Sequence, residues 1–318
     1  MPRALITGSS GFAGPYLAQH LLELGYEVVA GVHGPETGLP LRSLRCRRVC
    51  LDVTDQEGIQ RVVAEVQPDE IYHLAGLTRP VPDQINELYR VNLGGALNIL
   101  EVVREHAPET AVLLVGSAYA YGRSDRPVAE TKPFEPVNHY GISKAAADML
   151  GRRYALEVLR VVNVRPFNHS GPGQGPDFIL PALVQQFVEI KLGEREPVVH
   201  LGNLDSVRDF SDVRDIVRGY YLALQKGRAG EAYNLGSGRK VSALDLYELV
   251  QQEAGVEAEL KVEPSRVRAM DIPYLVADAS KAYGALRWKP EIPLRQTTRD
   301  MLDAFRDRSK AGDKAEKL

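Results

Sequence analysis

The chain has 318 residues with a formal net charge of -3, and 44% of its residues are hydrophobic and 25% charged. These ordinary globular values exclude a long disordered, collagen-like or coiled-coil protein, and the chain is long enough to bury its own core. The near-neutral charge argues against a nucleic-acid partner, which calls for a strong excess of Lys and Arg. Only Cys46 and Cys50 are present. Two cysteines are too few for a disulfide framework or a four-ligand zinc site, so we expect no metal centre.

The sequence also bears on localisation. The N-terminus lacks the pattern of a signal peptide, and no apolar stretch approaches the ~20 residues that a membrane helix requires. The two cysteines read as unpaired thiols in a reducing compartment. We therefore expect a cytoplasmic protein without membrane contacts.

Strand and helix patterns alternate along the first half of the chain. Short apolar runs predict strands at residues 3–7, 27–30, 49–51, 71–74, 112–115 and 158–164. Helical spacing of apolar residues falls between them, at residues 17–24, 58–66 and 96–106. Because parallel neighbours need a crossover connection, this alternation predicts an α/β fold with a doubly wound parallel sheet of the Rossmann type. We assign residues 1–165 to a dinucleotide-binding domain.

The pattern of predicted elements changes after Arg165. A stretch rich in Pro and Gly at residues 166–177 predicts an irregular loop. Shorter elements follow it, with helices expected at 178–192, 213–224, 244–254 and 294–305 and strands at 198–200 and 232–235. We assign residues 166–318 to a smaller α/β substrate lobe, of which some later elements return to the first domain. The interface between the two is the expected ligand site.

A glycine loop follows the first predicted strand. Gly8 suits a tight turn, Gly11 lets a pyrophosphate approach the backbone, and Gly14 allows close helix packing. The loop also contains Phe12 and opens a helix, whose N-terminus attracts an anion. Its position in a strand-helix-strand unit favours dinucleotide binding over a simple turn.

The end of the second predicted strand bears on the choice of cofactor. A carboxylate there bonds the ribose hydroxyls of NAD, whereas this strand ends at His33 without Asp or Glu. Arg42 and Arg45 follow downstream, so we expect NADP(H) rather than NAD(H), although these arginines could equally form a solvated face. Asp52 and Val53 are placed to meet the adenine, and Asp52 could instead cap the helix that begins near Asp55.

Tyr140, Lys144 and Ser117 form the sharpest chemical pattern. Residues four apart share a helix face, so the Lys144 ammonium can lie beneath the Tyr140 phenol. Lowering the phenol pKa from ~10 to neutrality requires roughly 4 kcal/mol of phenolate stabilisation, which a close cation can provide. Ser117 follows the fifth predicted strand and can bond the same substrate oxygen. Together with the glycine loop, the pattern predicts an oxidoreductase in which Tyr140 transfers the proton.

At this point the chain resembles the extended short-chain dehydrogenase/reductases acting on nucleotide sugars. The resemblance covers nearly the whole chain and rests on the glycine loop, Asp52-Val53, His73-Leu74-Ala75-Gly76, Val91-Asn92, Ser117, Tyr121-Gly122, Tyr140-Gly141-Ile142-Ser143-Lys144 and Arg208-Asp209-Phe210. Within that group, residues 165–174 and 202–210 are most similar to GDP-6-deoxy-4-keto-mannose reductases and their relatives, the GDP-mannose 4,6-dehydratases.

The resemblance implies roles for individual residues. Ser117, Tyr140 and Lys144 match the catalytic residues, and Asn168 and Arg208 match positions that bind the diphosphate. Arg268 and Asp271 match a pair that contacts the nucleoside, although they could equally have no such role. The similarity of residues 165–174 and 202–210 favours a GDP-linked substrate. The resemblance also implies contacts with the cofactor by Leu74, Ala75, Asn92, Phe167, Tyr140 and Lys144. A local ion pair remains an alternative for Arg208 and Asp209.

One departure from the resembled pattern concerns Tyr119. Dehydratases of this group carry an acidic residue there as the base on the sugar, and a phenol is a far weaker proton acceptor. We therefore expect NAD(P)H-dependent reduction of the 4-keto group of a GDP-6-deoxy-hexulose, with Ser117 and Tyr119 facing the sugar. The alternatives are a 4-epimerase with tightly held NAD and then a 4,6-dehydratase. Relatives commonly pair helices to form dimers, so we expect a homodimer formed by residues 96–106 and 145–155, although the apolar faces of these helices could equally belong to the core.

Overall fold

A seven-stranded parallel sheet forms the centre of the computed structural model, which describes residues 1–33, 41–78, 84–157, 159–263 and 272–315. Its strands run in the order β11-β6-β5-β4-β1-β2-β3. Their bounds are β1 Arg3–Thr7, β2 Glu27–Val32, β3 Arg47–Cys50, β4 Glu70–His73, β5 Ala111–Val115, β6 Val161–Pro166 and β11 Ala232–Leu235. All six pairings are parallel. The predicted doubly wound sheet is therefore confirmed.

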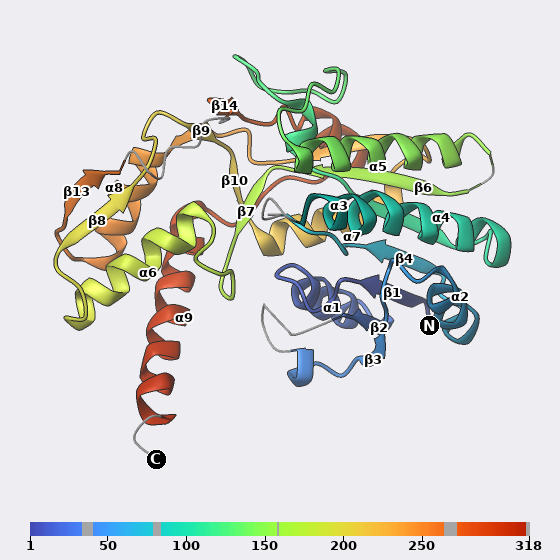
Figure 1. Ribbon diagram of the computed structural model, residues 1–318, viewed down its shortest axis with the longest axis horizontal. Coiled ribbons are helices and arrows are strands. Elements are labelled where there is room, and N and C mark those ends of the chain that lie inside the picture. The colour runs from blue at the N-terminus through green and yellow to red at the C-terminus, as the bar shows by residue number, and fades with distance from the viewer. Residues whose placement is uncertain (34–40, 79–83, 158, 264–271, 316–318) are drawn as a thin grey trace.

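Helices cover both faces of this sheet (Figure 1). On one face lie α1 (Gly14–Glu23) and α7 (Val213–Lys226), and their buried residues form a core with those of the sheet. On the other face lie α2 (Gln56–Val66), α4 (Gly95–His106) and α5 (His139–Ala155), which build a second core. The strands between the two cores are apolar on both sides, as expected for a parallel sheet.

The direction of winding reverses at β1, which pairs with β2 on one side and β4 on the other. Ligands of such sheets bind outside the carboxyl ends of the strands at this reversal. The segments that leave these ends include the glycine loop after β1 and the turn η4 (Ala118–Tyr121) after β5. Between β4 and α4 lie the short helix α3 (Ile85–Tyr89) and the π-helical turn η3 (Arg90–Gly94).

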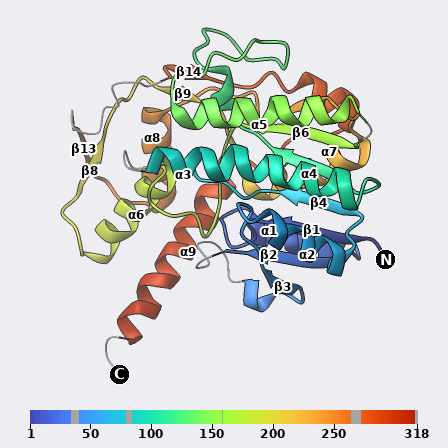
Figure 2. The ribbon, with the colours of Figure 1, turned by 45° about the vertical axis from the view of Figure 1, so that its right-hand side comes forward.

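A smaller group of elements lies to one side of the sheet in Figure 1, and in the turned view of Figure 2 its helices α6 (Ile179–Leu192) and α8 (Ala243–Ala254) overlap α3. The helices α6, α8 and α9 (Leu294–Ala315) pack around a third core. Short strands accompany them, namely β7 (Asn168–Ser170), β8 (Val198–Leu201), β9 (Val207–Arg208), β10 (Phe210–Asp212), β12 (Val241–Ser242), β13 (Glu259–Val262) and β14 (Tyr274–Leu275). The short helical turns η1 (Leu41–Ser43) and η6 (Ala282–Leu286) lie on the sheet side, where Leu41 and η6 join the α1 and α7 core.

Three elements after residue 165 belong with the sheet: β11 pairs with β6, α7 packs beside α1, and η6 joins the core of these two helices. The chain therefore returns to the first domain after visiting the lobe. The domain boundary between residues 165 and 166 stays a prediction.

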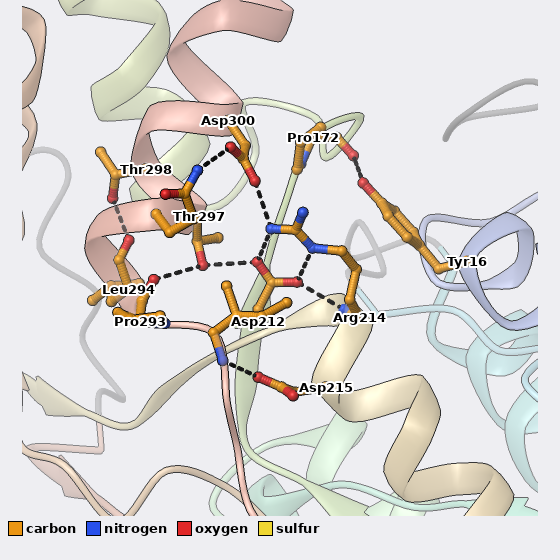
Figure 3. A network of polar contacts seen from close by, with 12 residues as sticks. Tyr16, Pro172, Asp212, Arg214, Asp215, Pro293, Leu294, Thr297, Thr298 and Asp300 are labelled. Carbon is orange, nitrogen blue, oxygen red and sulfur yellow. Dashed lines mark hydrogen bonds and ion pairs between the residues drawn. The ribbon is translucent and has the colours of Figure 1, made fainter. Parts of the chain in front are cut away.

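A polar network joins the start of α7 to α9 (Figure 3). The guanidinium of Arg214 donates to both oxygens of the buried Asp212 carboxylate (2.8 and 2.7 Å) and to Asp300 of α9 (2.6 Å). Thr297 Oγ1 also donates to Asp212 (2.8 Å). Because the pair is bidentate and reaches two helices, it fixes α9 and the lobe core behind it to the end of the sheet domain. Within the described residues, no helix is both long and apolar enough to cross a membrane.

Candidate active site

The glycine loop is held against the turn that follows β4. Gly8 has a positive φ of 68°, and a Cβ there would lie 2.6 Å from the backbone of Ala75. A Cβ on Gly14 would lie 2.4 Å from the carbonyl oxygen of Ser9, whereas one on Gly11 would meet only the carbonyl of Gly8 at 3.2 Å. Gly8 and Gly14 are thus required by close backbone approaches. The residues fit the expected phosphate cradle, with the N-terminus of α1 following directly.

Thr7 and His73 close this turn from below, a pair that the sequence reasoning missed. Thr7 Oγ1 accepts a hydrogen bond from Ala75 N (3.2 Å) and lies 2.9 Å from His73 Nδ1. Burial, together with the charge of Lys144, lowers the pKa of His73 to about 3. The imidazole is therefore neutral, and its Nδ1 shares a hydrogen bond with the hydroxyl of Thr7. This bond keeps the Leu74-Ala75 turn, a predicted cofactor contact, in register with the glycine loop.

Asp52 does not cap α2, because Asp55 does so by accepting from Gly58 N (3.0 Å). Asp52 Oδ1 instead accepts from Thr54 N and Thr54 Oγ1 (both 2.8 Å), and these bonds lower the pKa of Asp52. His33 and Arg90 also lower that pKa through their charges. The ionised carboxylate, with Val53 after it, thus lies among cationic groups near the end of β2. Their contact with an adenine stays a prediction.

Ser117, Tyr140 and Lys144 come from two elements that follow β5. Ser117 caps η4, and its Oγ accepts from Tyr119 N (3.2 Å). Tyr140 and Lys144 lie one turn apart on α5, which Asn138 caps by accepting from Gly141 N (2.8 Å). Ser117 hydrogen-bonds Tyr140, and Lys144 Nζ donates to the carbonyl of Val115 at the end of β5 (2.9 Å). The structure thus places the three expected catalytic side chains at the same edge of the sheet.

The pKa of Tyr140 was expected to be lowered by Lys144 together with an oxidised nicotinamide, and that joint effect stays a prediction. In the protein alone, Lys144 is not among the groups that shift this pKa. Burial raises the pKa of Tyr140 to about 12, although the Ser117 hydrogen bond works in the lowering direction. Burial also lowers the pKa of Lys144 to about 8. The physical reason is the same for both residues, since a low-dielectric site disfavours whichever form is charged. Tyr140 is therefore a protonated phenol at neutral pH.

Asn92 lies behind these residues in η3, where it was expected to contact the cofactor. Its Nδ2 donates to Leu77 O and to Ser143 Oγ (both 2.9 Å), and its Oδ1 accepts from Leu77 N (2.7 Å). Both amide hydrogens are used within the protein, and Asn92 is only 2% exposed. Through these bonds Asn92 joins the segment after β4 to α5.

Tyr119 faces Tyr140. The two rings are 5.9 Å apart between centroids and cross at 68°. Their hydroxyls are close enough for Tyr119 to contribute to the raised pKa of Tyr140, after burial and Ser117. Tyr119 is half-buried, and it places a phenol at the position that carries an acid in the resembled dehydratases.

The predicted diphosphate contacts lie on neighbouring short strands. Asn168 of β7 pairs in register with Phe210 of β10, and Arg208 of β9 precedes Phe210 by two residues. Arg208 does not form the local ion pair considered for it with Asp209. Asp209 is fully buried and accepts from Ser237 N, Ser237 Oγ, Gly238 N and Ala277 N at 2.6–3.1 Å. Arg268 and Asp271 lie outside the described residues.

An aromatic contact, also missed from the sequence, joins the lobe to the glycine loop. The rings of Phe12 and His169 stack at 6.0 Å with 14° between their planes, and Tyr16 of α1 donates to Pro172 O (2.6 Å; Figure 3). Phe167, a predicted cofactor contact, has its ring in a core cluster and is only 2% exposed. A contact with the cofactor would therefore come from its backbone and not from its ring.

The sheet order, the glycine loop at its reversal and the Ser117, Tyr140 and Lys144 group define an extended short-chain dehydrogenase/reductase. Comparison with known families agrees with this class. The family described as GDP-mannose 4,6 dehydratase matches residues 5–301. The chain belongs to this family.

Individual relatives are similar over most of their length. The chain is 31% identical to GDP-6-deoxy-D-mannose reductase from Pseudomonas aeruginosa, over 96% of this chain and 98% of that protein. It is 32% identical to GDP-6-deoxy-D-talose 4-dehydrogenase from Aggregatibacter actinomycetemcomitans, over 89% and 91%. The solved structure of RMD from Pseudomonas aeruginosa complexed with NADPH superposes with a TM-score of 0.84 at 29% identity, covering 97% of this chain and all of that one.

Proposed function

We propose that this protein reduces the 4-keto group of a GDP-linked 6-deoxy-hexulose, with NADPH as the hydride donor. The observation that carries the proposal is the placement of Ser117, Tyr140 and Lys144 together at the carboxyl edge of the sheet. Reduction of a carbonyl needs a proton donor at its oxygen, and a phenol with a pKa of about 12 holds its proton at neutral pH.

The chain's own residues divide the work as follows. When bound, the dinucleotide supplies the hydride that C4 of the sugar accepts. Ser117 hydrogen-bonds the carbonyl oxygen and orients it, and Tyr140 donates its proton to that oxygen as the C4–H bond forms. The products are the alcohol and the oxidised dinucleotide, and the Tyr140 phenolate regains a proton from water. Lys144 holds the ribose, and its ammonium stabilises the phenolate until that proton arrives.

An epimerase uses the same three residues but must first oxidise the sugar, which requires Tyr140 as a base. The described residues at the end of β2 provide no carboxylate, which favours NADP(H) over the tightly held NAD of an epimerase and so favours reduction. A dehydratase needs a base on the sugar, and Tyr119 offers a phenol in place of a carboxylate. These observations order the three activities as reductase, epimerase and dehydratase.

The preference for a GDP sugar and NADPH rests on the relatives and on charge. The relatives described above act on GDP-linked 6-deoxy sugars by name, and one is complexed with NADPH. The described residues at the end of β2, Val32 and His33, provide no carboxylate for a ribose 2′-hydroxyl. Asn168 and Arg208 are proposed to bind the diphosphate, for which a guanidinium offers a bidentate fork.

We also propose that the active protein is a cytoplasmic homodimer. Large apolar side chains are exposed on the two helices expected to pair, namely Leu97 on α4 (38%) and Ile142 and Met149 on α5 (40% and 62%). Ile142 and Met149 are seven residues apart and so share one face of α5. A second copy that covers these residues would remove their apolar surface from water.

The proposal is tested by mixing the purified protein with GDP-4-keto-6-deoxy-mannose and either NADPH or NADH, and by following absorbance and product. We expect one dinucleotide oxidised for each sugar reduced, faster with NADPH. Conversion of a GDP-hexose without net oxidation of added cofactor would establish an epimerase instead. Release of a 4-keto sugar from GDP-mannose would establish a dehydratase.

A further inference from the structure

A buried ion pair joins the helix of Tyr140 to the strand beside it. Arg165 of β6 donates from Nε and Nη2 to the two oxygens of Asp148 on α5 (both 2.8 Å), and the two side chains are 2% and 1% exposed. The fork therefore engages the carboxylate in a bidentate geometry, which fixes direction as well as distance.

The same guanidinium reaches the turn that carries Ser117. Its Nη1 donates to the hydroxyl of Tyr121 (2.7 Å), the last residue of η4, and that hydroxyl donates to Asn234 of β11 (2.8 Å). The Arg165 guanidinium also lies 4.6 Å from the ring centroid of Phe134 and 5.2 Å from that of Tyr121. One cation thus joins α5, η4 and β11.

The spacing along α5 relates this network to the chemistry. Tyr140, Lys144 and Asp148 are four residues apart, so they lie along one face of the helix. A clamp on Asp148 sets the rotation of α5 about its axis, and this rotation sets the directions of Tyr140 and Lys144. The Arg165–Asp148 pair also lies against Gly116. A Cβ built on Gly116 would be in van der Waals contact with both residues, at 3.6 Å from Asp148 Oδ2 and 3.7 Å from Arg165 Cγ. Gly116 directly precedes Ser117.

We infer that the Arg165–Asp148–Tyr121 network is a positioning device, which aligns Ser117 on η4 with Tyr140 and Lys144 on α5. The residues of the network do not touch the substrate in this assignment, and they act through the elements that they join. The inference rests on the proposed function for the reaction that is aligned. A buried ion pair is often no more stabilising than an apolar pair of the same size. A contribution to stability alone therefore does not account for the Arg165–Asp148 pair.

The sharpest test removes one hydroxyl from the network and one from a matched site. Tyr121→Phe deletes the link to η4 and leaves the ion pair in place. Tyr72→Phe is the control, because Tyr72 is also fully buried and its hydroxyl donates to Glu70 (2.7 Å) at the opposite edge of the sheet. We expect both variants to lose similar thermal stability, and only Tyr121→Phe to lose at least tenfold in kcat, with KM for sugar and dinucleotide within twofold.

A second readout does not depend on turnover. In protein labelled with ¹³C at tyrosine Cζ and free of dinucleotide, the resonance of Tyr140, assigned with Tyr140→Phe, reports its hydrogen bond to Ser117. We expect that resonance to shift in Tyr121→Phe and to stay in place in Tyr72→Phe. Asp148→Asn, which keeps the shape of the side chain, should give the same shift and a larger fall in kcat, and it replaces Tyr121→Phe if that variant does not fold.

The outcomes separate the two claims. If Tyr121→Phe and Tyr72→Phe behave alike in kcat and in the Tyr140 resonance, the network is structural only and the inference is wrong. If the wild type reduces no 4-keto sugar while the resonance shifts as expected, the proposed function fails and the alignment stands. A double variant, Asp148→Leu with Arg165→Met, that is as stable and as active as the wild type would also overturn the inference.

Discussion

At the amino edge of the sheet, Glu70 of β4 accepts hydrogen bonds from Tyr26 (3.2 Å), Tyr72 (2.7 Å) and Gln225 (2.7 Å). At the carboxyl edge, Lys144 has, among the described residues, one backbone carbonyl as its partner, and burial lowers its pKa to about 8. The first cluster pairs its charge with three donors, whereas the second holds a cation at a cost in stability. Hydrogen bonds to Glu70 therefore stabilise the amino edge, whereas the carboxyl edge holds a buried charge that lowers stability and is proposed to take part in the reaction.

The largest expected effect belongs to the carboxyl edge. Tyr140→Phe removes the proton donor, and we expect kcat to fall by about 10³-fold, near the usual contribution of a general acid. Binding of NADPH, measured by fluorescence titration, should change less than twofold. Reduction at the normal rate by this variant would contradict the assignment of Tyr140.

Arg208→Ala should have the next largest effect, through substrate binding. A lost charge-assisted contact with a diphosphate is expected to raise KM for the nucleotide sugar by about 10- to 100-fold, equivalent to roughly 1.5 to 3 kcal/mol. The dissociation constant for NADPH should stay within about twofold, which titration of the variant checks. The reverse pattern would place Arg208 at the cofactor.

The pH dependence of reduction separates Lys144 from Tyr140. Lys144 has a pKa of about 8 and loses its charge above that pH, whereas Tyr140 keeps its proton until about pH 12. We therefore expect kcat/KM to be level below pH 8 and to fall as the pH rises through it. A level profile up to pH 10 would show that the charge of Lys144 does not contribute.

The smallest effect on turnover is expected at the amino edge. Glu70→Gln keeps the shape of the side chain but weakens the bonds to two tyrosines, so the free energy of unfolding should fall by about 1 to 2 kcal/mol. Activity should stay within about twofold of the wild type, because the change lies at the end of β4 opposite His73. Denaturant unfolding and the reduction assay check both parts, and a tenfold loss of activity would break the comparison.

Much of this architecture could be predicted from local pattern. The strands 3–7 and 232–235 were predicted with the bounds that the structure has, because each is a short apolar run between clear breaks. The helix expected from residue 58 begins at Gln56, since Asp55 caps it and polar first-turn residues carry no apolar signal. The proximity of Tyr140 and Lys144 follows from helical spacing alone.

The contacts between distant segments could not be predicted in the same way. Asp148 lies four residues after Lys144 and was within reach of the spacing argument, but its partner Arg165 is 17 residues further along the chain. The charge of Arg165 within the apolar run 161–166 was the available signal, since a buried cation requires a partner. The Thr7–His73 and Phe12–His169 contacts depend on how separate loops meet, and the pKa of Tyr140 depends on burial that the sequence does not specify.

The comparison between the two edges is tested most directly by Lys144→Met, with the free energy of unfolding and kcat measured on the same protein. The pKa of Lys144 falls from 10.5 to about 8 on folding. Its buried charge therefore costs about 3 kcal/mol at pH 7, a net figure that already includes the bond to Val115. The folded protein binds fewer protons than the unfolded chain between pH 8 and 10.5, so the stability of the wild type rises across that window.

We predict that Lys144→Met unfolds with a free energy about 3 kcal/mol higher than the wild type at pH 7, that this gain disappears by about pH 10.5, and that kcat falls by at least 100-fold. A variant that is less stable than the wild type at pH 7, or one that keeps its activity, would contradict the account.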